Sequence, residues 1–140
     1  MTIDLVLNGR RTTLEARTDE MLIDALRREG LLSVRATCGI GVCGACTVLL
    51  DGEPLSGCLT LAAQAAGREI STVEGLKGSD PVQRAFNDAH AFQCGWCTPG
   101  FVLTVKAMRP GEDVREALSG NLCRCGCYLK IEEAVRTCGS

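Results

Sequence analysis

The sequence predicts an α+β protein built from two small units, a β-rich unit followed by a unit of four short helices. Three observations support this prediction. Strand-like alternation and turn signals occupy the first half, helical patterns with proline starts occupy the second half, and ten cysteines are divided between the two. Because aromatic residues make up only 4% of the 140 residues, neither unit has the material for a large core. We expect the cysteines to supply the missing stabilisation.

The chain is predicted to begin with a β-hairpin. Apolar side chains recur at alternate positions over residues 3–7, and Asn8-Gly9, the strongest short-range hairpin signal, follows at once. A helical pattern then occupies residues 19–29, with apolar residues on one face and acidic residues near its positive end. Gly30 is the expected stop, because glycine readily adopts the left-handed conformation that ends many helices.

Further strands complete the first unit. The predicted strands are residues 47–50, which precede an Asp-Gly turn, and residues 69–73. Together with the hairpin and the helix they give a ββαββ unit. Residues 74–81 carry two glycines, a serine and a proline and break both periodicities, so they are the expected link. We therefore place the first domain at residues 1–76 and the second at residues 77–140.

The second unit is predicted to contain four short helices, at residues 81–93, 99–109, 113–118 and 131–136. Prolines stand at the starts of the first two, where a missing N–H costs nothing. One cysteine pair falls between the first and second helices and another between the third and fourth, so two helical hairpins can face a shared metal centre. A bundle this small needs such a centre in order to fold.

Four cysteines of the first unit, Cys38, Cys43, Cys46 and Cys58, have the spacing of a plant-type [2Fe–2S] ligand set. The first three form C-x4-C-x2-C. Glycines between them permit positive φ and bring backbone N–H groups close to the sulfurs. Residues 38–46 contain no Asp or Glu, which suits a tetrathiolate cluster whose charge is roughly −2 to −3.

The second unit contributes the pairs Cys94/Cys97 and Cys123/Cys125. Four thiolates in two chelating pairs make one site. A structural zinc ion is the alternative to an iron–sulfur cluster, because tetrahedral zinc sites also use C-x2-C pairs. A C-x-C pair is less usual for zinc, but on these residues alone both metals stay open.

Three segments carry a resemblance to a known family: residues 38–52, 92–100 and 121–125, which read CGIGVCGACTVLLDG, FQCGWCTPG and NLCRC. With Cys58-Leu-Thr and Glu74-Gly-Leu, they closely resemble the small iron–sulfur subunits of molybdenum hydroxylases, the group of xanthine dehydrogenase, carbon monoxide dehydrogenase and aldehyde oxidoreductase. The resemblance runs nearly end to end, and the two cysteine signatures in this order are highly specific.

This resemblance implies a β-grasp, plant-type ferredoxin domain with one [2Fe–2S] cluster on the first four cysteines. It implies a four-helix domain with a second [2Fe–2S] cluster on Cys94, Cys97, Cys123 and Cys125, which disfavours zinc. It also implies that Gln93 hydrogen-bonds the pterin of the molybdenum cofactor on a partner. The alternative for that glutamine is a side chain that caps a helix end.

By the same resemblance, the chain is the electron-transfer subunit of a heteromeric oxidoreductase. Electrons leave a molybdopterin cofactor, in a dinucleotide form, on a large subunit and pass through the two clusters to FAD on a medium subunit or to another acceptor. The sequence offers no acid–base or nucleophile constellation, so we expect no catalysis by this chain alone. The alternative function is a freestanding ferredoxin-like electron carrier.

Charge and hydropathy exclude other partner classes. Fifteen Lys and Arg face seventeen Asp and Glu, which leaves no basic footprint for nucleic acid and no polybasic membrane anchor. No apolar run approaches the ~20 residues of a membrane helix, so no membrane insertion is expected. We read no secretory signal at the N-terminus and expect the cytoplasm, where thiols stay reduced and favour metals over disulfides.

Three residues near the motifs have open roles. Cys127 is either an inert buried thiol or a ligand that exchanges with Cys125, and Cys138 is expected to be a free thiol. Trp96 stands where the family commonly has phenylalanine. We expect it to pack or to donate an indole hydrogen bond at a subunit interface rather than to take part in redox chemistry.

Overall fold

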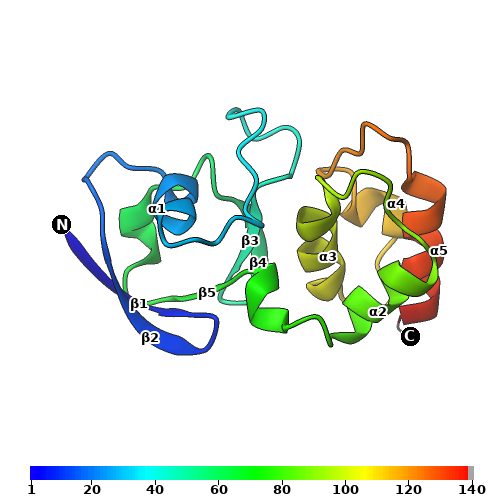
Figure 1. Ribbon diagram of the computed structural model, residues 1–140, viewed down its shortest axis with the longest axis horizontal. Helices are drawn as coiled ribbons and strands as arrows, with labels where there is room; N and C mark the ends of the chain where they lie inside the picture. The colour runs from blue at the N-terminus through cyan, green and yellow to red at the C-terminus, as the bar shows by residue number, and fades with distance from the viewer. Residues whose placement is uncertain (139–140) are drawn as a thin grey trace.

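A computed structural model describes residues 1–138 and has two parts, a sheet-containing part and a helical part, joined by the segment before α2 (Figure 1). The cysteine-bearing loops of both parts lie at the same end of the molecule, at the top of the view. The elements in chain order are β1 (Thr2–Leu7), β2 (Arg10–Glu15), α1 (Leu22–Arg28), β3 (Thr47–Leu50), β4 (Glu53–Ser56), η1 (Ala62–Ala65), β5 (Glu69–Ser71), η2 (Val73–Leu76), α2 (Pro81–Asp88), α3 (Thr98–Lys106), α4 (Val114–Ala117) and α5 (Tyr128–Cys138).

The five strands form one mixed sheet in the order β2-β1-β5-β3-β4. β1 pairs with β5 in parallel, and the other three pairings are antiparallel. The predicted hairpin is present, and Asn8 and Gly9 have φ of 50° and 81°, the left-handed values that a tight hairpin turn requires. Asp51 and Gly52 repeat this geometry between β3 and β4. The left-handed backbone of these two-residue turns therefore sets the strand register of both hairpins.

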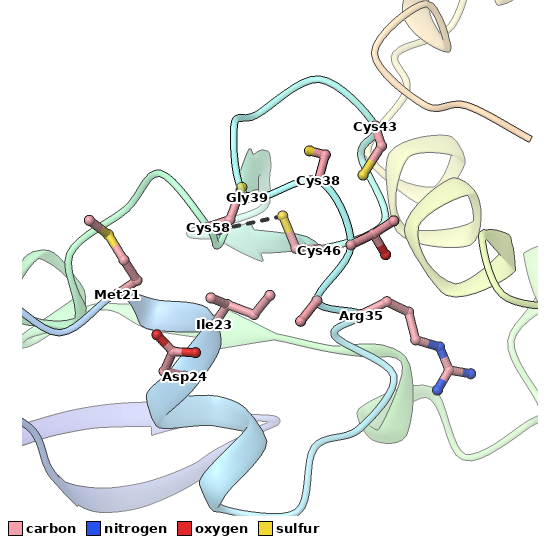
Figure 2. Close-up of a pocket in the computed structure, with 11 residues that line it drawn as sticks. Met21, Ile23, Asp24, Arg35, Cys38, Gly39, Cys43, Cys46 and Cys58 are labelled. Atoms are coloured by element: carbon pink, nitrogen blue, oxygen red, sulfur yellow. Dashed lines mark hydrogen bonds between the residues drawn. The ribbon is translucent and has the colours of Figure 1, made fainter.

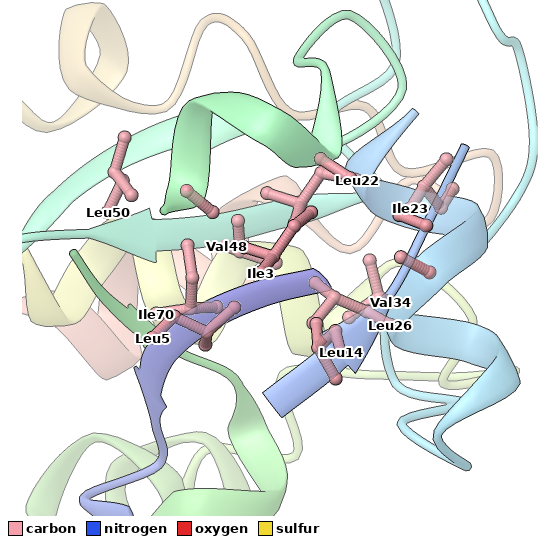
Figure 3. Packing of buried hydrophobic residues seen from close by; sticks show 14 of the residues in the cluster. Ile3, Leu5, Leu14, Leu22, Ile23, Leu26, Val34, Val48, Leu50 and Ile70 are labelled. Atoms are coloured by element: carbon pink, nitrogen blue, oxygen red, sulfur yellow. The ribbon is translucent and has the colours of Figure 1, made fainter. Parts of the chain in front are cut away.

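One face of the sheet and helix α1 enclose the first core (Figure 3). Strand residues at alternate positions of β1 point into it, as the sequence pattern predicts. This core holds α1 and β3 in place, and the loop that carries three of the cysteines connects these two elements. Its fully buried side chains include Ile3, Leu14, Leu22, Leu26, Val48 and Ile70.

A second, separate core lies among α2, α3, α4 and α5, as the four predicted helices require. Phe101 occupies its centre and meets the Tyr128 ring edge-on at 6.3 Å. None of the helices within residues 1–138 is long and apolar enough to cross a bilayer. The buried side chains of this core include Phe86, Phe101, Val102, Leu118, Ile131 and Ala134.

β5, α3, α4 and α5 begin or end up to three residues from their predicted positions, and three further features differ more clearly. Strand β4 was not predicted because it is an exposed edge strand with little apolar alternation and with Pro54, which only an edge strand tolerates. Helix α1 begins at Leu22 rather than residue 19, since Met21 is extended and forms a bridge with Leu61. Helix α2 ends at Asp88 because His90 has φ of 51° and stops it.

The two parts touch along a narrow, tightly packed contact. A Cβ added at Gly100 of α3 would lie 2.3 Å from the carbonyl oxygen of Gly44, so only glycine permits this approach. Asn121, which is buried, donates to the same carbonyl at 3.2 Å and accepts a hydrogen bond from Thr104 at 2.9 Å. Val73 and Leu76 of η2 pack against the second core. A domain boundary at residue 76 stays a prediction.

Candidate metal centres

The four cysteines of the first set gather around one hollow. Figure 2 shows the sulfurs of Cys38, Cys43, Cys46 and Cys58 directed toward a common space at the end of the loop that precedes β3. These cysteines line a hollow of about 330 Å³. The fold brings Cys58 to the other three because the β3–β4 hairpin returns the chain beside the loop. The predicted first set is therefore assembled in space.

Backbone N–H groups of the loop point at the sulfur of Cys38. The N–H groups of Ile40 and Val42 donate to it at 3.5 and 3.4 Å. Gly39 and Gly41 have φ of 69° and 77°, and this left-handed backbone turns successive N–H groups toward one side. These donors, that of Ile40 foremost, lower the pKa of Cys38 to about 6. The loop thus favours a thiolate at this position.

Cys43 and Cys46 also accept hydrogen bonds from backbone N–H groups, and Cys46 is buried. The Ala45 N–H donates to the Cys43 sulfur at 3.5 Å, and the Cys58 N–H donates to the Cys46 sulfur at 3.4 Å. Burial raises the pKa of the Cys46 thiol to about 11. A cationic centre is the partner that turns such a buried thiol into a thiolate, because metal coordination deprotonates it outright.

The second set is assembled less completely. Cys94, Cys97 and Cys123 line a hollow of about 350 Å³ between the start of α3 and the loop that follows α4. Cys97 directly precedes the first residue of α3, and Cys123 is buried. Cys125, the fourth predicted member, is exposed and does not line this hollow. The structure therefore brings three of the four together.

Backbone donors recur around the second set. The Trp96 N–H donates to the Cys94 sulfur at 3.5 Å, and the Cys127 N–H donates to the Cys123 sulfur at 3.4 Å. Burial raises the pKa of Cys97 to about 12. Cys127 is half-buried, and its backbone N–H contacts the sulfur of Cys123. Its two predicted roles, an inert thiol or a ligand that exchanges with Cys125, stay predictions.

The residues present fit two iron–sulfur clusters. Each hollow is bordered by several thiols and by backbone N–H groups aimed at sulfur, the combination that holds and stabilises an anionic sulfur cluster. Within residues 1–138, no three Cys, His, Asp or Glu side chains converge on the position of a single metal ion. The sulfurs surround hollows rather than one point.

The two hollows share a wall. Cys43 lines both of them, and Ala45 beside it lines the second. The carbonyl oxygen of Cys43 accepts a hydrogen bond of 2.9 Å from the N–H of Leu122, which is bonded directly to Cys123. A connection of covalent bonds and one hydrogen bond therefore runs from a cysteine of the first set to a cysteine of the second.

Sequence reasoning missed polar residues of the second site, among them Thr37 and Tyr128. The hydroxyl of Tyr128 accepts a hydrogen bond of 2.8 Å from the N–H of Cys123 and borders the hollow. An aromatic residue shortly after a cysteine motif is too weak a signal to reveal this. Gln93 is exposed immediately before Cys94, and Cys138 is half-buried against the second core.

Two families of known domains match successive parts of the chain. A family of 2Fe-2S iron-sulfur cluster binding domains matches residues 5–72, and a family of [2Fe-2S] binding domains matches residues 72–136. The second match favours an iron–sulfur cluster over zinc in the helical part. Both halves of the chain are therefore [2Fe–2S]-binding domains, and the fold is a plant-type ferredoxin domain followed by a helical one.

Relatives match over nearly the whole chain. The nicotine 6-hydroxylase small subunit of Paenarthrobacter nicotinovorans is 48% identical over 95% of this chain and 86% of its own length. The xanthine dehydrogenase iron-sulfur-binding subunit of Escherichia coli O157:H7 is 44% identical over 99% of this chain and 94% of its own. A chain of quinoline 2-oxidoreductase from Pseudomonas putida 86 superposes with a TM-score of 0.91, at 43% identity over 96% of this chain and 90% of that chain. With both domains matched and relatives this similar, the chain belongs to the family of small iron–sulfur subunits of molybdenum hydroxylases.

Proposed function

We propose that this chain carries two [2Fe–2S] clusters and relays electrons within a larger oxidoreductase, from a molybdopterin-bearing large subunit toward a FAD-bearing subunit or another acceptor. The named relatives are small or iron–sulfur-binding subunits of such enzymes, which supports a role as one part of a complex. The proposed ligands are Cys38, Cys43, Cys46 and Cys58 for the first cluster and Cys94, Cys97, Cys123 and Cys125 for the second.

The observation that carries this proposal is the position of Cys43, which lines both hollows. Two purely structural metal sites have no need to lie close together, whereas these two hollows share a bordering residue. A relay needs short, well-bonded connections, and the hydrogen bond from Leu122 to the Cys43 carbonyl supplies one. When bound, a [2Fe–2S] cluster accepts or releases a single electron, so two of them in series suit a two-electron oxidation.

The residues of the chain hold and shield these centres. Backbone N–H groups at Cys38 and Cys123 stabilise negative charge on sulfur, and this helps to set the reduction potentials. Burial of Cys46 and Cys123 limits the access of water to one side of each hollow. Cys125 is exposed in this structure, and its ligation requires a shift of the loop between Cys123 and Tyr128.

Exposed apolar side chains around the first hollow support a partner on that face. Ile40, Val42 and Leu59 are 69%, 54% and 60% exposed. Leu59 lies against Gly41 of the cysteine loop, so these side chains belong to one surface. Apolar groups gathered at a redox site are typical of a docking face. We propose that the electron acceptor, a FAD-binding subunit or another protein, binds here.

A second apolar surface borders the second hollow. Leu122 and Tyr128 line that hollow and are 46% and 42% exposed, and Phe92 and Leu129 are exposed nearby in the sequence. We propose that the large molybdenum-binding subunit covers this face. We propose that Gln93, which is exposed beside Cys94, hydrogen-bonds the pterin dinucleotide cofactor of that subunit.

Metal analysis and electron paramagnetic resonance test the proposal. We expect the complex, purified with its partners, to contain about four irons per copy of this chain and to give two distinct [2Fe–2S] signals after reduction. About two irons and a single signal would contradict the two-cluster assignment. A zinc protein would be colourless, with neither signal.

Serine substitutions test the ligand assignment. Cys43→Ser should abolish the signal of the first cluster and leave the second reducible by substrate, since the proposed ligands of the second cluster do not include Cys43. Cys97→Ser should abolish the second signal and impair assembly. Cys138→Ser is the matched control, because Cys138 borders neither hollow, and it should leave both signals intact. Loss of both signals from Cys43→Ser would argue against two independent sites.

Gel filtration separates this proposal from a freestanding ferredoxin-like carrier. A subunit of a complex elutes together with molybdenum and a much larger chain, whereas a carrier elutes alone. We also propose a cytoplasmic location, where thiols stay reduced and available to iron. Recovery of the assembled complex from a periplasmic or extracellular fraction would contradict that location.

A further inference from the structure

A second link between the two parts lies at Trp96 and is independent of the hydrogen bond at Cys43. The indole Nε1–H of Trp96 donates to the hydroxyl oxygen of Thr37 at 2.8 Å. Thr37 is bonded to Cys38 of the first set, and Trp96 is bonded to Cys97 of the second. Both residues line the hollow of the second set. One side-chain hydrogen bond thus joins the immediate neighbours of two cysteines that belong to different sets.

Arg35 also contacts the face of the Trp96 indole ring. The guanidinium carbon of Arg35 lies 4.8 Å from the centroid of the Trp96 ring, within the range of a cation–π contact. Arg35 is itself anchored: its backbone N–H donates to Ala45, and its side chain donates to the Leu32 carbonyl at 2.9 Å. In Figure 2 the Arg35 side chain extends away from the four sulfurs. The first domain therefore offers a fixed cation and a fixed acceptor to one aromatic side chain of the second.

Trp96 and Thr37 are exposed to solvent, and the buried part of this contact is Arg35. The Nε of Arg35 is buried and has no hydrogen-bond partner in the protein, so the guanidinium is held here despite a lost hydrogen bond. Trp96 keeps its own backbone N–H on the Cys94 sulfur at 3.5 Å, which ties the ring to the second cysteine loop. Movement of the indole relative to Thr37 would move that loop relative to Cys38.

We propose that Arg35, Thr37 and Trp96 form an interdomain strut that fixes the separation of the two cysteine sets and thereby the coupling between the centres they hold. This inference rests on the proposed function, because it presumes a cluster in each set. Trp96 acts as a positioning residue: its indole is neither oxidised nor reduced, and its contribution is to keep two loops in register. The tryptophan contributes an N–H donor that phenylalanine lacks.

The test is the spin–spin interaction between the two reduced clusters in the purified complex, measured by electron paramagnetic resonance. Trp96→Phe keeps a ring over Arg35 but removes the donor, and Thr37→Val keeps the shape but removes the acceptor. Each should diminish the splitting and slow electron exchange between the clusters, because both quantities depend on the separation that this hydrogen bond fixes. The double variant should lose no more than either single variant, because both remove the same bond.

Two further variants distinguish the strut from general damage near the clusters. Thr37→Ser retains a hydroxyl and should keep the wild-type splitting. Tyr128→Phe removes a polar group that accepts from Cys123 but that makes no bond across the domains, so it should alter the second signal while the splitting stays. If Trp96→Phe fails to assemble, the splitting is compared between Thr37→Val and Thr37→Ser instead. Thr37 is exposed, so these substitutions do not disturb a core.

The outcomes also separate this inference from the proposed function. Unchanged splitting in Thr37→Val, or equal loss in Tyr128→Phe, would overturn the strut while two clusters are still observed. A wild-type complex that lacks one of the two signals would instead overturn the proposed function. Loss of splitting in Trp96→Phe and Thr37→Val with retention in Thr37→Ser supports the strut.

Discussion

At the scale of single residues, the buried side chain of Asn121 decides how the helical part meets the sheet. It donates to the Gly44 carbonyl at 3.2 Å and accepts from the Thr104 hydroxyl at 2.9 Å. Buried polar groups that lose a partner pay the full cost of their desolvation. Asn121 stands two residues before Cys123, so its contacts also determine where the second cysteine loop begins.

We expect Asn121→Ala to lower the free energy of unfolding by about 1–3 kcal/mol, because it leaves the Gly44 carbonyl and the Thr104 hydroxyl less well satisfied. Chemical denaturation followed by circular dichroism measures this change. Asn87→Ala, on the exposed surface of α2, is the matched control and should change stability little. Equal effects of the two substitutions would show that the Asn121 contacts contribute nothing.

At the scale of elements, the short helices depend on their ends. Asp80 caps α2: its carboxylate accepts from the Val82 N–H at 2.9 Å and pairs with Lys106 of α3 at 2.5 Å. Burial raises the pKa of this carboxyl, but the hydrogen bonds from Lys106 and Val82 outweigh burial and leave the pKa below its usual value. This stabilisation is therefore complete above the pKa of the unfolded chain and is lost as the pH falls through the folded value.

At pH 7, where the Asp80 carboxylate contributes in full, Asp80→Ala should destabilise the helical part by about 1 kcal/mol, the usual value of an N-cap. Asp80→Asn keeps an N-cap acceptor and loses only the charge, so it should cost less, because partly exposed ion pairs contribute little. Thermal unfolding midpoints of the two variants provide the comparison. If both variants lose the same stability, the Lys106 pair rather than the cap is responsible.

At the scale of the whole molecule, two small cores meet through close glycine contacts, hydrogen bonds and the packing of η2 against the second core. A side chain at Gly100 of α3 would collide with the carbonyl oxygen of Gly44, and one at Gly44 would collide with the carbonyl oxygen of Gly120. The close approach lets α3 pack beside β3, and it places Cys97, at the start of α3, near Cys43.

Gly100→Ala should therefore destabilise the assembled chain by about 1–3 kcal/mol, the cost of overpacking, although alanine is intrinsically the better helix former. Gly120→Ala is the matched control, since a Cβ at Gly120 meets nothing within 4 Å. Denaturation midpoints of the two alanine variants measure the difference. A Gly100→Ala protein as stable as the wild type would mean that the two parts separate at no cost.

Removal of iron should affect the two parts unequally. The first part has a five-stranded hydrogen-bonded sheet over its core, whereas the second is made of helices of four to eleven residues. We expect chelation to abolish hydrogen-exchange protection in α3 and α5 while β1 and β5 stay protected, because a small bundle depends on its metal. Retained protection throughout the helices would show that the second core is sufficient alone.

The sequence by itself determined the features that depend on neighbours along the chain. Local backbone chemistry predicts the Asn8-Gly9 and Asp51-Gly52 turns and the four helices of the second part. All of these are present in the structure. The resemblance of the cysteine motifs also predicted the family that the comparisons confirm.

Only the tertiary structure decided what depends on residues far apart in the chain. These features arise where separate segments meet. They are the edge strand β4, the approach of Gly44 to Gly100, the position of Cys43 between the two hollows, and the hydrogen bond from Trp96 to Thr37. A sequence pattern specifies which face of an element is apolar, but not which partner that face will meet or at what distance. Packing and hydrogen bonding between the two folded parts settle those choices.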